Sequence, residues 1–106
     1  ISVDENIKAL TTDEFDKLLI ENELVLVDFH TQWCAPCKKM SPVVDEIETE
    51  YKDKAMVLRI DLDTSTDLAK KYSVISVPTF IVFKSSSEVW RHAGIISKEL
   101  LIEQIK

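Results

Sequence analysis

The chain has 106 residues, of which 45% are hydrophobic and 30% charged, and a formal net charge of −6 at pH 7. This length and balance favour one globular domain over residues 1–106. The acidic charge argues against a nucleic-acid partner, because phosphate backbones repel it. No apolar run approaches the roughly 20 residues that span a bilayer, so we expect no membrane partner.

The first half of the chain predicts two strands and two helices. Residues 3–7 form a candidate short strand, and a capping box opens a helix at Thr11. Residues 24–29 are nearly continuous in apolar side chains, which is typical of a central strand covered on both faces. A long helix is expected from about Cys34, and Pro42 should bend it because proline lacks the backbone N–H.

The second half of the chain predicts three strands and two more helices. Residues 55–62 indicate a core strand and residues 66–72 a short helix. Residues 79–84 and 88–93 flank a serine-rich turn and predict an antiparallel hairpin, after which Ser97 caps a final helix. Strand–helix–strand units favour parallel pairing. The predicted fold class is therefore α/β, with a mixed central β-sheet flanked by helices on both faces.

The chain contains two cysteines, Cys34 and Cys37, in the segment "QWCAPCKK". Cys34 follows a predicted strand and opens a helix, where the unpaired N–H groups and the helix dipole favour a thiolate. Lys38 and Lys39 add positive charge, and Pro36 suits the first helical turn. Residues three apart on a helix lie close enough for a disulfide after some adjustment, so we expect a labile bond.

Two other interpretations of the cysteine pair stay open at this point. A zinc site needs four ligands and would have to recruit His30 and His92, which lie far apart in the sequence. A purely structural disulfide would close a very small loop and gain little stability from it. We expect no metal.

The segment "VDFHTQWCAPCK" resembles the active-site segment of thioredoxins, whose usual form is VDFWAxWCGPCK. "VPTF", with Val77 and Pro78, resembles the cis-proline loop of that family. Gly94, the only glycine of the chain, matches a family glycine beside the active site. The resemblance covers essentially the whole chain, and it implies one thioredoxin domain over residues 1–106 with a thioredoxin fold.

The resemblance also implies roles for individual residues. Cys34 is the expected nucleophile that attacks a substrate disulfide, and Cys37 the resolving thiol. Asp28 matches a buried family aspartate that accepts the proton of the resolving thiol, although a solvated carboxylate at a strand end is the alternative. Arg59 falls where thioredoxins often carry a lysine and would tune Asp28, unless it is simply an exposed arginine.

The same resemblance implies an apolar platform on which an extended substrate segment lies, bonded to the backbone of Val77. A cis peptide bond before Pro78 is expected on this basis. For Trp33, ordinary core packing is the alternative. The expected substrate-binding residues are Trp33, Pro36, Val77, Pro78, Ala93 and Gly94.

Two departures from the family pattern bear on the chemistry. Ala35 replaces the usual glycine between the cysteines, which stiffens the turn and leaves the reduction potential open. His30 replaces a common tryptophan, and histidine titrates near neutrality. His30 therefore either couples to the thiol or is an exposed bystander.

These observations predict a thiol–disulfide oxidoreductase that reduces disulfides in protein substrates. No cofactor is expected to bind, since the chain has no nucleotide-binding glycine motif. Electrons would come from NADPH through a partner flavoprotein, thioredoxin reductase. The expected state is a cytoplasmic monomer, or a periplasmic or exported one if a signal segment was removed before Ile1. The alternatives are an exported disulfide oxidase or isomerase and a redox-independent binding module.

Overall fold

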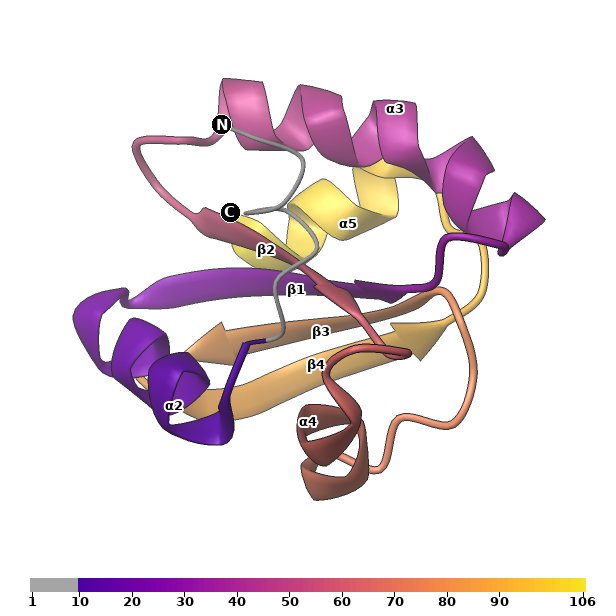
Figure 1. The fold of residues 1–106 in the computed structure, drawn as a ribbon. Helices are drawn as coiled ribbons and strands as arrows, with labels where there is room; N and C mark the ends of the chain where they lie inside the picture. The colour runs from indigo at the N-terminus through magenta and orange to yellow at the C-terminus, as the bar shows by residue number, and fades with distance from the viewer. Residues whose placement is uncertain (1–9) are drawn as a thin grey trace.

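The structure is a computed structural model that describes residues 10–106, so the strand expected at residues 3–7 lies outside the described part. The order of helices and strands from residue 10 onward is the predicted one (Figure 1). The elements are α2 (Thr12–Glu21), β1 (Leu24–His30), α3 (Ala35–Glu50), β2 (Met56–Asp61), α4 (Thr66–Lys71), β3 (Thr79–Lys84), β4 (Ser87–Ala93) and α5 (Lys98–Ile105).

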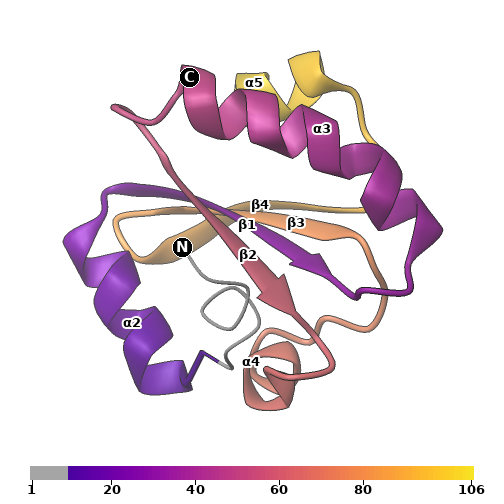
Figure 2. The same cartoon turned by 45° about the horizontal axis from the view of Figure 1, so that its top comes forward.

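The strands form one mixed sheet in the order β2-β1-β3-β4. Strand β1 runs parallel to β2 and antiparallel to β3, and β3 and β4 form the predicted antiparallel hairpin. Helices α3 and α5 cover one face of the sheet, and α2 and α4 lie on the other (Figures 1 and 2). The predicted α/β class, with helices on both faces of a mixed sheet, is confirmed.

Strand β1 is central because its side chains are apolar on both faces. Leu24 and Leu26 pack in the core beneath α3 and α5. Val25, Val27 and Phe29 point the other way and pack in the core beneath α2 and α4. Since side chains alternate along a strand, every even-numbered residue of β1 faces α3, the helix that carries the cysteines.

The helix starts follow the sequence signals. The Thr11 hydroxyl accepts a hydrogen bond from the Glu14 N–H at 3.0 Å, and the Glu14 carboxylate accepts one from the Thr11 N–H at 2.9 Å. This is the predicted capping box. The predicted cap of α5 is simpler, since the Ser97 hydroxyl accepts one hydrogen bond from the Leu100 N–H. Helix α3 continues through Pro42 as one element. The bend expected at Pro42 stays a prediction.

Within residues 10–106, no helix is both long enough and apolar enough to cross a membrane.

Ser73, the second residue after α4, provides a test of how this helix ends. Its φ of 54° lies in the left-handed region. The Ser73 N–H donates to the Lys70 carbonyl and the Val74 N–H to the Ala69 carbonyl, which together form a Schellman motif. Ser73→Gly should raise the free energy of unfolding by about 0.5–1 kcal/mol, because glycine adopts this conformation without Cβ strain. Urea denaturation measures the change, and Ser73→Ala is the control that should give no gain.

Candidate active site

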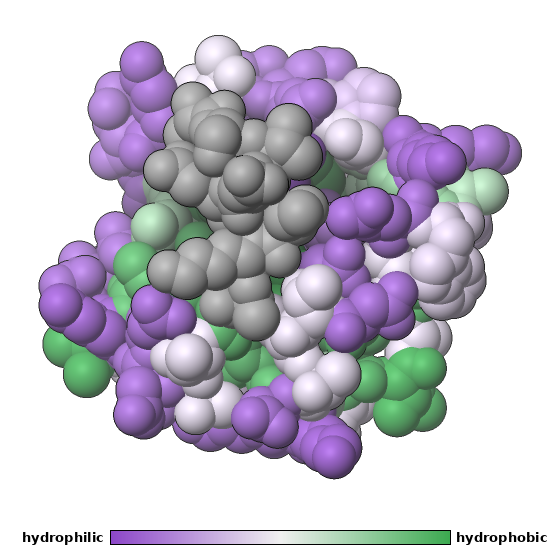
Figure 3. All heavy atoms as spheres, viewed as in Figure 1, coloured by the Kyte–Doolittle hydropathy of each residue, from purple (hydrophilic) through white to green (hydrophobic). Residues whose placement is uncertain are grey.

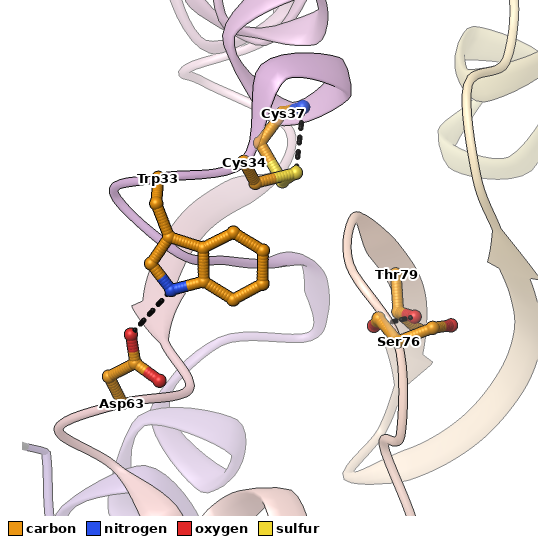
Figure 4. Close-up of a disulfide and its surroundings, with 6 residues drawn as sticks. All are labelled: Trp33, Cys34, Cys37, Asp63, Ser76 and Thr79. Carbon is orange, nitrogen blue, oxygen red and sulfur yellow. Dashed lines mark hydrogen bonds between the residues drawn. A yellow bond between two sulfur atoms is a disulfide. The ribbon is translucent and has the colours of Figure 1, made fainter.

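The two cysteines lie where β1 passes into α3. Cys34 is the N-cap of α3, and its sulfur accepts a hydrogen bond from the Cys37 N–H at 3.1 Å. A disulfide joins Cys34 to Cys37, with a Cα–Cα distance of 5.2 Å that is normal for such a bond (Figure 4). The Cys34 sulfur is thus held at the positive end of the helix dipole, as the sequence predicts.

Trp33, next to Cys34, is a surface residue with 71% of its area exposed. The alternative of ordinary core packing for Trp33 is therefore wrong. Its indole Nε1–H donates to the Asp63 carboxylate at 3.0 Å (Figure 4). Asp63 was not among the site residues predicted from the sequence. Its position two residues after β2 could have indicated it, because the carboxyl ends of parallel strands meet at one edge of the sheet.

The second wall of the site is the segment that leads into β3. The Val77–Pro78 peptide bond is cis, as the family resemblance implies. The Pro78 carbonyl accepts a hydrogen bond from the Gly94 N–H at 2.8 Å, which joins this segment to the end of β4. Gly94 has a φ of 101°, a conformation that side chains strongly disfavour. Thr79 donates from its hydroxyl to the Ser76 carbonyl at 2.8 Å, which fixes the start of β3 (Figure 4).

Between these walls lies a mainly apolar groove of about 510 Å³ that reaches Cys34. Ile75, which was not predicted from the sequence, lines this groove and is 94% exposed. Figure 3 shows hydrophobic atoms gathered where the α4–β3 connection meets the surface. Three of the expected substrate-binding residues, Pro78, Ala93 and Gly94, do not line the groove. Ala93 pairs with Thr79 in the register between β3 and β4. The groove is lined by Thr31, Trp33, Cys34, Ala35, Pro36, Leu62, Asp63, Ile75, Ser76 and Val77.

A second, smaller pocket of about 230 Å³ lies beside Cys37. It is lined by Asp28, His30, Thr31, Gln32, Cys37, Lys38, Ser41 and Arg59. The groove therefore reaches Cys34 and the smaller pocket reaches Cys37. The two cysteines therefore have different surroundings: Cys34 lines the mainly apolar groove, and Cys37 lines the pocket that Asp28 also lines.

Asp28 is 6% exposed, so the alternative of a solvated carboxylate is wrong. Its Oδ1 is buried and has no hydrogen-bond partner among residues 10–106. Burial raises the pKa of Asp28 to about 6, while the charges of His30 and then Arg59 act to lower it. The Asp28 carboxyl is therefore still mostly ionised at pH 7, yet it takes up a proton far more readily than an exposed aspartate.

Arg59 lies beside Asp28 in the register between β1 and β2. Its guanidinium is paired with Asp45 and lies 3.7 Å from Glu48, both on α3. The carboxylate in direct contact with Arg59 is therefore that of Asp45 on α3. The Nε of Arg59 is buried and has no hydrogen-bond partner within the described part of the chain.

Thiol–disulfide exchange needs an attacking sulfur, a second sulfur within bonding reach, and a surface on which a partner can lie. All three meet at the start of α3, which makes this chain a thiol–disulfide oxidoreductase.

Comparison with known proteins identifies the family. The thioredoxin family model matches residues 6–106. Over 97 residues the chain is 41% identical to a thioredoxin of Staphylococcus aureus, covering 92% of each chain. It is 39% identical to the chloroplastic thioredoxin Y of Oryza sativa subsp. japonica, covering 93% of this chain and 60% of that protein. The chain belongs to the thioredoxin family.

Solved structures agree with this assignment. The thioredoxin of Fasciola hepatica superimposes with a TM-score of 0.83 at 36% identity, covering 92% of this chain and 95% of that one. Mitochondrial thioredoxin 3 of Saccharomyces cerevisiae, in its oxidized form, gives a TM-score of 0.84 at 30% identity, covering 98% and 97%. The fold is the thioredoxin fold.

Proposed function

We propose that the protein reduces disulfide bonds of other proteins by dithiol–disulfide exchange through Cys34 and Cys37. The Cys34 thiolate attacks one sulfur of the substrate disulfide and releases the other as a thiolate, which leaves a mixed disulfide. Cys37 then attacks the sulfur of Cys34 and releases the second substrate thiol. The substrate gains two electrons and the protein ends as the Cys34–Cys37 disulfide. The observation that carries this proposal is that disulfide, set at the N-terminus of α3 beside an open groove.

Asp28 is the proposed proton acceptor of the resolving step. The thiolate is the nucleophile in such exchange, so Cys37 must lose its proton before it attacks. Asp28 and Cys37 line the same pocket, and a carboxyl with a pKa of about 6 is ionised at neutral pH. A pocket of about 230 Å³ also has room for water to carry the proton between them. Arg59, beside Asp28, favours its ionised form.

The groove is the proposed place for the substrate. An extended segment would lie against Trp33, Pro36 and Val77, with main-chain hydrogen bonds to the backbone of Val77, as an added strand does. Pro78, Ala93 and Gly94 support the far wall of this surface through the hydrogen bond from Gly94 to Pro78. Main-chain bonding accepts many sequences, which suits a reductase that serves several protein substrates.

Electrons would return the protein to its dithiol form through a partner flavoprotein, thioredoxin reductase, supplied by NADPH. The nucleotide and the flavin would belong to that partner. The protein would act as a monomer, in a compartment that keeps thiols reduced, such as the cytoplasm.

Insulin reduction tests the proposed function. With NADPH and a thioredoxin reductase, the wild-type protein should catalyse reduction of insulin disulfides, followed as NADPH consumption and as precipitation of the free B chain. A Cys34→Ser, Cys37→Ser double variant has the same groove without the sulfurs and should be inactive. Equal activity of wild type and double variant would contradict the proposal, and binding without turnover would favour a redox-independent binding module.

A further inference from the structure

His30 is the last residue of β1 and lies two positions after Asp28. Residues two apart on a strand point to the same face, so both side chains face α3. Both line the 230 Å³ pocket that reaches Cys37. His30 is half-buried. The family resemblance gives no role to this position, where a tryptophan is common.

Three other charged side chains lie around Asp28. Each either keeps its ordinary charge at neutral pH or is already bound to another group. Arg59, on β2, is always charged and its guanidinium is held by Asp45 of α3. Lys38, on α3, lines the pocket and is exposed to solvent. Asp61, on β2, pairs with His30 in the strand register, but its Oδ1 accepts the Asp63 N–H at 2.8 Å. Among the groups that line this pocket, histidine is the type whose charge ordinarily changes between about pH 5 and 8 without special perturbation.

We propose that His30 is a positioning residue that acts through Asp28: the positive charge of its imidazolium form favours the ionised Asp28 carboxyl and so keeps the base of the resolving step available. This inference rests on the proposed role of Asp28 as that base. A positive charge that shares a pocket with a buried carboxyl favours the ionised carboxylate. Burial alone would protonate Asp28 at a higher pH and so remove the base. With the charge of His30 nearby, Cys37 can therefore resolve the mixed disulfide at a lower pH.

Three variants of the full chain separate charge from shape. His30→Gln removes the charge and keeps a polar side chain of similar length. His30→Lys carries a charge at every pH of interest, and its flexible stem can reach solvent from a half-buried position. His92→Gln is the matched control, because His92 lies on β4, stacks on Trp90 and does not line the pocket.

The first readout is the protonation of Asp28 in the oxidised protein, in which the cysteines do not titrate. The infrared band of the protonated carboxyl, assigned by its loss in Asp28→Asn, gives the midpoint directly. The midpoint should move to higher pH in His30→Gln, stay near or below the wild-type value in His30→Lys, and be unchanged in His92→Gln. If His30 had only a structural role, the Asp28 midpoint would not differ between His30→Gln and His30→Lys according to charge.

The second readout is the single-turnover rate at which a preformed mixed disulfide is resolved. In His30→Gln this rate should fall severalfold at about pH 5.5, where histidine is ordinarily charged, and match wild type at about pH 8. His30→Lys should restore the rate at the lower pH. The inference is overturned if His30→Gln leaves the Asp28 midpoint in place, or if His30→Lys behaves like His30→Gln.

The two readouts also distinguish failure of this inference from failure of the proposed function. If Asp28→Asn does not slow resolution, Asp28 is not the base, whatever His30 does to its protonation. If Asp28→Asn slows resolution but the His30 variants leave the Asp28 protonation midpoint unchanged, Asp28 remains the base and the role of His30 is refuted.

Discussion

A Cys37→Ser variant is expected to accumulate a mixed disulfide with its protein substrate, and a Cys34→Ser variant to accumulate none. Cys34 lines the open groove, so it can attack a bound disulfide, whereas Cys37 lines only the smaller pocket beside Asp28. Without Cys37 the attack still occurs, but no thiol remains to release the substrate. Both variants should lose essentially all turnover in the insulin assay, because each step of the exchange needs its own sulfur.

A non-reducing gel after incubation with a disulfide-containing protein measures this difference. The mixed species should disappear on addition of a reductant, and mass spectrometry should locate its bond at Cys34. The double serine variant serves as the control for non-covalent association. Trapping through Cys37 in the Cys34→Ser variant, to the same extent as through Cys34 in the other, would reverse the assignment of the two sulfurs.

Asp28→Asn is expected to slow the resolving step while leaving the first attack by Cys34 nearly unchanged. Asparagine keeps the size of the side chain but cannot accept the proton of Cys37. General-base assistance is typically worth about 10²–10⁴-fold, and water in the pocket will replace part of it. Stopped-flow measurement of the two steps separates them: the mixed disulfide should form at the wild-type rate and persist longer.

The same substitution is expected to stabilise the protein at neutral pH. The pKa of Asp28 is raised from 3.8 to about 6, so the native state resists the ionisation that the unfolded chain undergoes. Protonated Asp28 contributes to the free energy of unfolding because the native state favours the neutral carboxyl. This contribution is fully present below about pH 4 and is lost as pH rises through about 6. At 1.36 kcal/mol per pKa unit, Asp28→Asn should gain at most about 3 kcal/mol at pH 7 and almost nothing below pH 4.

Urea midpoints of wild type and Asp28→Asn at several pH values measure this gain. Asp53→Asn is the matched control, because Asp53 is an exposed aspartate in the turn before β2, and its substitution should leave stability and resolution unchanged. A pH-independent stability difference would mean that Asp28 is not a buried titrating group. If resolution is also unchanged, the mechanism loses its base.

Much of the fold could be predicted because its signals are local. The apolar run of β1, the capping box at Thr11 and the cap at Ser97 depend on residues that are close together in the chain. The position of Cys34 at a helix start was predictable for the same reason. The cis bond before Pro78 came from the family resemblance, since the sequence pattern alone gives it only about a 5% base rate.

The features that were missed depend on contacts between distant segments. The hydrogen bond from Trp33 to Asp63 requires knowing that β2 is parallel to β1 and ends beside it. Ile75 lies between α4 and β3, next to the buried Val74, and the sequence does not show which of two adjacent apolar loop residues faces solvent. The pocket that His30 shares with Asp28 depends likewise on the packing of α3 over β1, which no local pattern shows.

The reduction potential of the Cys34–Cys37 pair is the most direct test of the claim that this protein donates electrons to protein disulfides. Equilibration with a thiol–disulfide buffer of known poise, read out by alkylation and mass spectrometry, gives the value for wild type. We expect a potential near that typical of thioredoxins, about −270 mV, which favours donation to most substrates. A value near about −120 mV, as in strongly oxidising exported oxidases, would contradict the account and assign the protein to disulfide formation instead.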